Sequence, residues 1–496
     1  MFDQGKVSKV ATPSATGAPL ATLSVGLKTA FGLGSVAEGI AFTTNNTFLL
    51  LFYNQVLGLS PALVGLALSA GLIVNAVFDP LVGSWSDRTR SRLGRRHPFM
   101  FAAIVPVALC YVALYHPPTL FGSTGQLIWL AVMNTLLLQA TTLFHTPHLA
   151  LGAELSNDYL ERSSVMNYNT LCLWVGDSLG LVIALRYFFA SSPTFPNGAL
   201  DPTRYASYAL FMAGSIMLLL FLSSWWTRSQ IALLPAPATT MESISPRRFV
   251  ADLRYVLRNR NYVVLLFALL ATSLMIGARN GLAYYASTYY WQLSNEEISW
   301  FTLGSAGGYI LGGLIVKRLH KRFDKRWTGA AASFGYATLP AIPLALGYLG
   351  ILTPTTPGLL VILVALAVLH YAPYSIVSTT VRSALADIAD EIELKFGVRQ
   401  EGMLFAARTF FQRIDTALGT ALAGWVLALV AFPAKAVPGQ IDQATLQGLA
   451  AAYVLATIPG LIAAFFYTML RVTRDTHAAT QAAIAARANP MPESPT

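Results

Sequence analysis

A few charged side chains lie inside long apolar runs of the sequence: Glu38, Asp79, Asp177, Arg279, Arg408, Arg413 and Asp415. Each costs about 2.5–3.5 kcal/mol at the centre of a membrane-spanning helix, so each should face a partner or a wet cavity. A buried acid of this kind can bind and release a cation. A purely structural role is the alternative for each of them. Arg279 could pair with Asp177, and Arg408 with Asp415, only to hold helices together.

Two polar stripes at helical spacing suit a sugar. Thr170, Trp174 and Asp177 stand at i, i+4 and i+7, so one helix face combines an aromatic plane with a hydroxyl and a carboxylate. Glu38 and Asn45 share a face in the same way. Sugar hydroxyls bind carboxylates and amides, and the apolar faces of the sugar ring stack on aromatic rings. Hydrogen bonds between membrane helices are the alternative use of such stripes.

The composition excludes a soluble globular protein. Of 496 residues, 55% are apolar and only 11% are charged, and the mean hydropathy is +0.55. Too few polar side chains remain to cover a surface in water, so the surroundings must be largely lipid. Cys110 and Cys172 lie in apolar runs, which predicts small core residues and neither a disulfide framework nor a cysteine metal site.

The apolar runs predict an all-α polytopic membrane protein with twelve spans of about 20 residues or more. The expected spans are 24–53, 61–85, 98–115, 126–153, 164–189, 205–226, 262–291, 297–316, 327–349, 357–380, 402–431 and 444–471. The aromatic cluster near the end of the seventh span reads as an interfacial belt. It consists of Tyr284, Tyr285, Tyr289, Tyr290 and Trp291.

The net charge of +10 follows membrane topology and not nucleic-acid binding. Arginines gather in the turn after the second span, and lysines and arginines gather in the turn after the eighth, which predicts that both turns are cytoplasmic. Alternate connections near 54–60, 115–125, 292–296 and 350–356 carry no Lys or Arg. We therefore expect an integral protein of the cytoplasmic (inner) membrane with both termini inside.

The longest polar stretch divides the spans six and six. The expected plan is a disordered cytoplasmic tail over 1–23, a six-helix bundle over 24–226, a cytoplasmic linker over 227–261, a second six-helix bundle over 262–472 and a cytoplasmic tail over 473–496. The two basic turns fall at equivalent places in the two halves. A shared plan explains this, although the positive-inside rule alone could also place them there.

Three local strings carry a family resemblance. They are NAVFDPLVGSWSDRTRSRLGRRHPF at 75–99, TPHLALGAELSNDYLER at 146–162 and ADIADEIELKFGVRQEG at 386–402. In this order and spacing they resemble the glycoside-pentoside-hexuronide:cation symporters, a branch of the major facilitator superfamily that includes the melibiose carrier. In that family the third string looks like the loop between helices ten and eleven. The resemblance implies the major facilitator fold, with two six-helix bundles that open alternately to the two sides of the membrane.

The resemblance assigns the coupling cation to the Asp-Pro of the second helix, here Asp79 and Pro80. Melibiose-type members have a second carboxylate one turn earlier, where this chain has Asn75. The matching hydroxyl on helix four is Thr142, and the basic residue on helix eleven is Arg413. A single buried acid suffices for a proton but offers Na⁺ few negative oxygens, so we expect H⁺, with Na⁺ at Asp79 as the alternative.

The sugar site of the melibiose-type carriers transfers poorly to this chain. Gly39 stands where they have a sugar-binding aspartate, and Glu38 lies one residue away on a different face. His145 replaces their helix-four aspartate, and Thr170 replaces their helix-five arginine. His145 could titrate during coupling or simply hydrogen-bond within the helix packing. The full set of expected substrate-binding residues is Glu38, Asn45, His145, Thr170, Trp174, Asp177, Arg279 and Arg413.

The sequence therefore predicts a cation-coupled carrier of a sugar or glycoside that works as a monomer in the lipid bilayer, without nucleic acid or any cofactor besides the coupling ion. The expected gating loop holds Asp87, Arg88, Arg95 and Arg96. When the carrier faces outward, its arginines should pair with cytoplasmic acids such as Glu154, Asp158, Asp387 and Asp390, at about 0–1 kcal/mol for each pair.

Two other functions stand as alternatives. A carrier of lysophospholipids or other amphiphiles with the same fold is the nearer one. A membrane enzyme is disfavoured, because the sequence has no metal-spaced His and carboxylate cluster and no Gly-Lys phosphate loop.

Overall fold

The computed structural model describes residues 23–156, 158–233, 254, 257–396 and 401–488. All regular elements in these ranges are helices. The expected N-terminal tail over 1–22 and most of the expected linker lie outside the described residues.

The first half of the chain forms six long helices: α1 (Val25–Leu51), α2 (Pro61–Arg88), α3 (His97–Leu114), α4 (Gly122–Glu154), α5 (Tyr159–Ile183) and α6 (Arg204–Thr227). The second half forms α8 (Arg260–Tyr285), α9 (Asn295–Arg322), α10 (Lys325–Thr338), α11 (Ala341–Tyr348), α12 (Leu359–Phe396), α13 (Glu401–Leu429), α14 (Gln443–Leu455), α15 (Ile458–Thr468) and α16 (Arg474–Ala488).

The helices agree with twelve membrane spans. Within the described residues nine helices are long and apolar enough to cross a bilayer, with α14 and α15 taken as one, and the bent pair α10 and α11 makes a tenth. α1 and α13 have 27 and 29 residues, enough to span, but they carry more polar side chains. The ninth span bends by 41° between α10 and α11, where Pro340 cannot continue the hydrogen-bond ladder.

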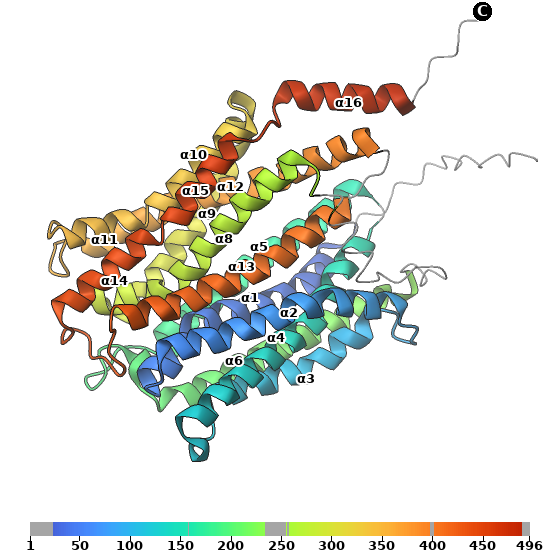
Figure 1. The fold of residues 1–496 in the computed structure, drawn as a ribbon. Helices are drawn as coiled ribbons and strands as arrows, with labels where there is room; N and C mark the ends of the chain where they lie inside the picture. Colours follow the sequence, from blue (N-terminus) through green and yellow to red (C-terminus); the bar gives the residue numbers. More distant parts are fainter. Residues whose placement is uncertain (1–22, 157, 234–253, 255–256, 397–400, 489–496) are drawn as a thin grey trace, which may run out of the picture.

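The two halves repeat one packing plan. α1 packs against α5 and α6, and α8 packs against α13 and α15 in the same way. α4 lies between α2 and α3, and α12 lies between α9 and α10. Each half is therefore a bundle of six spans, as the major facilitator fold requires. Figure 1 shows the first half, blue to green, below most of the second half.

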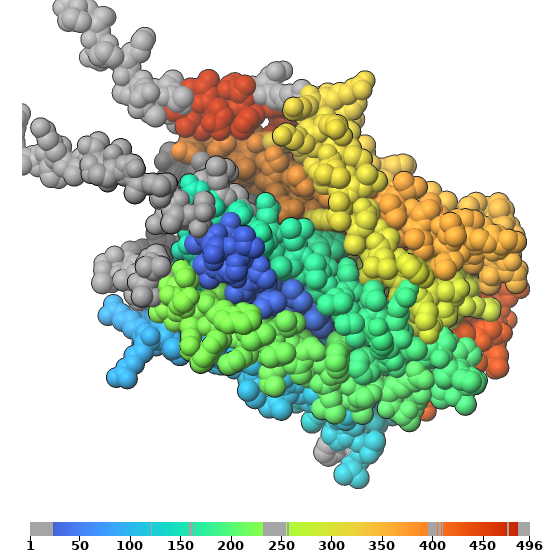
Figure 2. Space-filling model, turned by 180° about the vertical axis from the view of Figure 1, so that it is seen from behind, coloured from blue at the N-terminus to red at the C-terminus, as the bar shows by residue number. Residues whose placement is uncertain are grey.

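Three pairs of α-helices make the main contacts between the halves, and α1 against α8 is one of them. α13 lies along α2 (Figure 1), and α5 borders α9, which Figure 2 shows as teal against yellow. Glycines permit the close approach of α2 and α13, because a Cβ at Gly65 would meet the Cα of Gly424 at 3.2 Å. Beside them, Ser69 of α2 donates to the carbonyl of Ala417 at 2.7 Å. The interface thus brings residues of α2 and α13 into direct contact.

One end of the molecule is sealed across the two halves. α1, α5 and α8 each end in a π-helical turn there: η1 (Phe52–Val56), η3 (Ala184–Phe188) and η6 (Ala286–Tyr290). Gln55 Nε2 donates to the Pro433 carbonyl at 3.1 Å, and its Oε1 accepts from Ala436 N at 2.8 Å and from the Tyr289 hydroxyl at 3.2 Å. The Tyr285 hydroxyl donates to Asn54 at 2.9 Å.

A second group of buried amides completes this seal. Asn197 donates to Thr288 at 3.0 Å, and Asn295 donates to Asn197 at 2.9 Å and to the Phe189 carbonyl at 2.6 Å. Tyr284 donates to Asn295. The expected aromatic belt is therefore wrong for this cluster: Tyr284, Tyr285, Tyr289 and Trp291 are buried. The three tyrosine hydroxyls have protein partners across the interface, so these tyrosines close the bundle and do not sit at the lipid headgroups.

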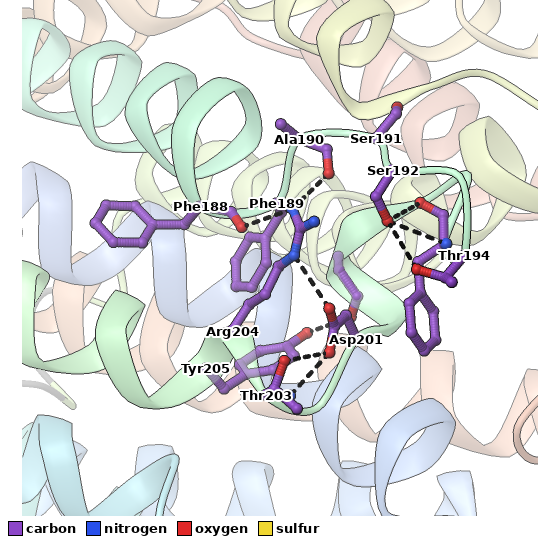
Figure 3. Close-up of polar contacts among 12 residues, drawn as sticks. Phe188, Phe189, Ala190, Ser191, Ser192, Thr194, Asp201, Thr203, Arg204 and Tyr205 are labelled. Atoms are coloured by element: carbon purple, nitrogen blue, oxygen red, sulfur yellow. Dashed lines mark hydrogen bonds and ion pairs between the residues drawn. The ribbon is translucent and has the colours of Figure 1, made fainter.

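The loop that carries Asn197 is held by Arg204 and Asp201 (Figure 3). Arg204 donates to the carbonyls of Phe188 and Ala190, at 3.2 and 2.5 Å, and pairs with Asp201 at 3.1 Å. Burial alone raises the pKa of Asp201, but hydrogen bonds from the Thr203 hydroxyl and amide outweigh it and hold the pKa below its ordinary value. The loop is thereby fixed against the end of α5.

The third family string is helical over most of its length. It was expected to be a loop, yet α12 continues to Phe396. Leu385, Ile388, Ala389 and Ile392 are buried in one apolar cluster, and their spacing is that of one helix face. Acidic residues on the other face concealed this pattern. The expected C-terminal tail likewise contains a helix, α16, which packs against α12.

We expect Gln55→Ala to weaken the seal, because it removes three cross-half hydrogen bonds and leaves buried groups unpaired, at about 1–3 kcal/mol each. The population open at this end should rise by about fivefold or more. Spin labels at exposed Leu120 and Leu349 would report it as a longer distance. Thr355→Ala, in an exposed loop, is the control. An unchanged distance distribution in Gln55→Ala would show that the seal does not set the conformation.

Candidate functional site

Asp79 lies at the interface between the halves, and its two oxygens have different partners. Oδ2 forms an ion pair with Arg413 Nε of α13, and Oδ1 accepts from Thr142 Oγ1 of α4 at 2.7 Å. The side chains of Asp79 and Arg413 are 17% and 25% exposed. Because α2 belongs to the first half and α13 to the second, a single ion pair ties the two bundles together at the expected cation site.

Asn75 and Thr142 complete the group. Thr142 lies 2.7 Å from Asp79 and 2.9 Å from Asn75, but its single hydroxyl proton serves only one acceptor. With the Asn75 amide turned, its nitrogen donates to Thr142 at 2.9 Å and its oxygen accepts from Arg413 Nη1 at 2.7 Å. Every contact then has one donor and one acceptor. The structure thus brings Asp79, Asn75, Thr142 and Arg413 together.

This arrangement makes ion binding compete with a contact between the halves. A carboxylate and a guanidinium that are both largely buried neutralise each other at low cost, whereas either alone is expensive. A proton or a cation on Asp79 removes the charge that Arg413 binds. Such a change of charge would weaken the contact between α2 and α13.

Glu38 lies nearby on α1 and faces two histidines of α4. Its Oε2 is 2.7 Å from His145 Nδ1, and its Oε1 is 3.8 Å from His148 Nδ1. Glu38 is buried, whereas the side chain of His145 is 39% exposed. The sequence placed Glu38 and His145 among substrate-binding residues but gave no sign that they touch.

An aromatic wall forms where α5, α9 and α12 meet. The Trp174 ring packs on Tyr309 with a centroid distance of 4.3 Å, and Tyr374 and Tyr371 lie at 6.3 and 6.5 Å. Asp177, one turn along α5, accepts from Thr43 of α1 at 2.5 Å. A carboxylate beside stacked rings is a polyol-binding arrangement, although no other member of the expected stripe shares it. Thr170 bonds to the Met166 carbonyl of its own helix at 3.0 Å.

Arg279 has a structural partner different from the expected one. It donates to the carbonyls of Tyr336 and Ala337, at the end of α10 where the ninth span bends, and its guanidinium lies 5.6 Å from the Tyr453 ring centroid. It therefore satisfies carbonyls that the broken helix leaves without an intrahelical donor. The Arg279–Asp177 pair considered as a structural alternative is not formed: Arg279 binds these carbonyls, and Asp177 accepts from Thr43.

Three other expected residues also sit apart from the Asp79 group. Arg408 Nε and Asp415 Oδ2 are buried without hydrogen-bond partners, so these atoms do not form the pair considered from the sequence. Asn45 accepts from the Tyr115 hydroxyl of the helix-three end at 3.3 Å. Its role here is contact within the first bundle.

The expected gating loop forms its pairs within the first half. Arg96 binds Asp87 and Glu154, both at 2.6 Å, and Arg95 binds Glu154 at 2.9 Å. Arg88 is exposed at the end of α2. The other expected partners are engaged elsewhere. Asp158 caps α5, Asp387 pairs with Lys325 and His477, and Asp390 accepts from Gln481.

Sequence reasoning missed several residues that the site brings together. Tyr309, Tyr371 and Tyr374 look like ordinary core aromatics, and only the packing of α9 and α12 against α5 reveals the wall. His148 could have been found, because it lies three residues after His145 and so shares its face of α4.

Comparison with known proteins gives the chain a family. The sequence profile described as MFS/sugar transport protein matches residues 30–474. The inner membrane symporter YicJ of Escherichia coli is 26% identical over 82% of this chain and 83% of its own length. The isoprimeverose transporter of Lactiplantibacillus pentosus is 25% identical over 80% of this chain and 79% of its own.

Solved structures support the fold. The crystal structure of a D-xylose-proton symporter superposes with a TM-score of 0.61 over 90% of this chain and 98% of that one, at 14% identity.

A sodium-dependent lysophosphatidylcholine symporter of Danio rerio is 30% identical in sequence, but over only 32% of this chain and 30% of its own length. Similarity along most of the chain is thus to symporters that include a sugar carrier.

Arg279→Gln is expected to lower the stability of the second bundle, because carbonyls at the α10–α11 bend lose a charged donor, at about 1–3 kcal/mol each. Thermal unfolding in detergent should show a lower midpoint, with ligand affinity retained. Arg382→Gln, at an exposed arginine of α12, is the matched control. Loss of affinity at unchanged stability would instead make Arg279 a substrate ligand.

Proposed function

The chain belongs to the MFS/sugar transport protein family, and on that premise we propose that it carries a sugar or glycoside together with a proton that binds to Asp79. Its relatives include symporters, and it is an integral membrane transporter of that type. The observation that carries the proposal is the Asp79–Arg413 ion pair across the interface of the two bundles.

The proposed cycle uses that pair as the coupling element. Protonation of Asp79 leaves Arg413 without its carboxylate and frees α2 to move against α13. Substrate then binds better to the protonated carrier than to the deprotonated one, which is all that coupling requires. Release of substrate and proton on the other side restores the pair. Alternating access follows from two rigid bundles that rock about a central site.

We favour H⁺ over Na⁺ because Asp79 is the single carboxylate of its group. Its neighbours Asn75 and Thr142 contribute neutral oxygens, and Arg413 contributes a positive charge. A sodium ion needs several oxygen ligands and prefers negatively charged ones, and this group offers a single carboxylate beside a positive guanidinium. A proton needs only that one carboxylate. Sodium coupling is the competing outcome of the transport test below.

The aromatic wall supports a sugar as substrate. Trp174, Tyr309 and Asp177 offer ring faces and a carboxylate from two different bundles, so a sugar held there would contact both moving bodies. Lysophospholipid transport is not favoured, because similarity to such a symporter covers about a third of the chain. Under the predicted topology the sealed end is the outer one, and this conformation faces the cytoplasm.

Asp79→Asn should abolish uphill accumulation of sugar in vesicles, while exchange of internal for external sugar persists, because the variant cannot gain or lose the coupling ion. Uptake is measured under a proton gradient and, separately, under a sodium gradient. Asp442→Asn, at the exposed N-cap of α14 where Asn caps as well as Asp, is the control and should accumulate normally. If Asp79→Asn still concentrates sugar under either gradient, Asp79 is not the coupling site.

Trp174→Ala should weaken sugar binding by about tenfold, since loss of a stacked ring costs about 0.5–1.5 kcal/mol beyond its buried area. Trp174→Phe should keep most of the affinity. Binding is measured on purified protein over a panel of monosaccharides, glycosides and uronides. Trp225→Ala, on the exposed side of α6, is the control. Equal affinity in Trp174→Ala and the wild type would place the sugar elsewhere.

A further inference from the structure

Glu38 is a buried carboxylate that the Asp79 group does not use. It is 9% exposed, and one of its oxygens, Oε2, contacts His145 Nδ1 at 2.7 Å. The other oxygen, Oε1, has no hydrogen-bond partner among the residues that the structure describes. A buried carboxylate with a free oxygen is costly unless a proton or a counter-charge lies next to it.

The cavity beside Glu38 offers its carboxylate no other charged or hydrogen-bonding partner. The Glu38 side chain borders this small cavity between α1, α3, α4 and α6. The remaining lining residues are Ala37, Ala41, Val107, Thr141, Phe144, Ile216 and Leu220. Apart from the Thr141 hydroxyl, which donates to the Leu137 carbonyl of its own helix, these side chains are apolar. On the contacts seen here, the groups that face the Glu38 carboxylate with a polar atom are the two histidines of α4.

His148 fixes where a proton can sit. Its Nε2 lies 2.9 Å from the Phe31 carbonyl, which can only accept, so Nε2 carries a proton. In neutral His148 the other nitrogen, Nδ1, is then an acceptor. It faces the free Oε1 of Glu38 at 3.8 Å. Without a further proton, Nδ1 of His148 and Oε1 of Glu38 are both acceptors and repel each other. A proton on either atom would turn that repulsion into attraction.

His145 gives this buried group a route to the interior space. Its Nδ1 contacts Glu38, while 39% of its side chain is exposed. Rotation of one imidazole can therefore carry a proton between the exposed region and the buried carboxylate. When Glu38 and neutral His145 bind one further proton between them, the pair has no net charge. Without that proton the pair carries one buried negative charge.

Other charges near the group come from both halves. Thr142, which donates to Asp79, lies three residues before His145 on the same face of α4, so the Asp79–Arg413 pair of α2 and α13 borders the Glu38 group. On α5, Asp177 is bound by Thr43, and Glu161 pairs with Lys28 at the distant start of α1. The lining from α3 and α6 is uncharged. Arg413 is thus the cation of this set that lies beside the group.

We propose that Glu38, His145 and His148 form a second proton-binding site, which shares Arg413 with Asp79. While Asp79 is ionised, Arg413 is bound to it, and the Glu38 site keeps its proton. When Asp79 is neutralised, Arg413 turns to Glu38 and replaces the proton as its counter-charge. The proton leaves through His145 to the solvent of the cavity. Occupancy of the two sites is therefore opposed.

The consequence for transport rests on the proposed function. A proton that arrives at Asp79 drives another from the Glu38 site, so proton entry and proton exit can occur at different residues within one cycle. The binding itself does not depend on transport and can be measured without any sugar.

Histidine nitrogen resonances of the purified full chain, followed by NMR against pH without substrate, test the site. His145 is assigned with His145→Gln, and His116, exposed on a loop after α3, is the internal reference. Glu38→Gln should lower the midpoint at which His145 loses its proton by about one pH unit or more, since an opposite charge in contact is removed. The midpoint of His116 should not move.

The shared arginine is tested in the same spectra. Asp79→Asn should also lower the His145 midpoint, and adding Arg413→Gln to that variant should raise it again. An infrared carboxylic-acid band that is weak in Asp79→Asn, returns when Arg413→Gln is added and disappears when Glu38→Gln is added as well would report Glu38 independently. Thermal melting establishes that each variant is folded.

Two results would overturn the proposal. If the His145 midpoint is the same in Glu38→Gln as in the wild type, no second site exists. If it responds to Glu38 but not to Asp79→Asn, the sites do not share Arg413. Failure of Asp79→Asn to block accumulation in vesicles would instead reject the coupling function and leave the Glu38 site standing.

Discussion

The ion pair between Asp79 and Arg413, which joins the two helix bundles at their interface, is the constraint on which the rest of the structure depends. Asp79 and Arg413 are each expensive alone and inexpensive together. The close approach of α2 and α13, with glycine against glycine and Ser69 on the Ala417 carbonyl, keeps the two charges within reach. Any event that changes the charge of Asp79 therefore alters the free energy of the contact between the bundles.

The two interfaces between the bundles use different chemistry. At the sealed end most contacts join tyrosine hydroxyls, amides and backbone carbonyls, with Gln55 and Asn295 at their centres. Two charged side chains also take part: Arg186 donates to Ser299, and Glu296 accepts from Ser191. Their partners across the interface are neutral, so these hydrogen bonds can be exchanged for bonds to water at small net cost. The centre instead uses an ion pair, whose strength changes with the charge of Asp79.

The main elements could be predicted from the sequence because the bilayer imposes strong rules on it. Apolar length identified the spans, and the cost of a buried charge together with the Asp-Pro string identified Asp79 and its partners Thr142 and Arg413. Pairings set only by tertiary packing could not be predicted. Nothing local shows that Arg279 binds the carbonyls of a bent helix, or that Tyr285 and Tyr289 face the other bundle. The span predicted from the sequence ends before α12 does, because acidic residues on one face of the helix obscure the apolar residues on the other.

The two bundles repeat one packing plan, yet Asp79 comes from one repeat and Arg413 from the other. Each bundle alone would expose to hydrocarbon a charge that its own helices do not neutralise. The halves are thus alike in architecture but not self-sufficient, and neither is an autonomous folding unit of the kind that internal symmetry suggests. The two halves must assemble together because each supplies the counter-charge that the other needs.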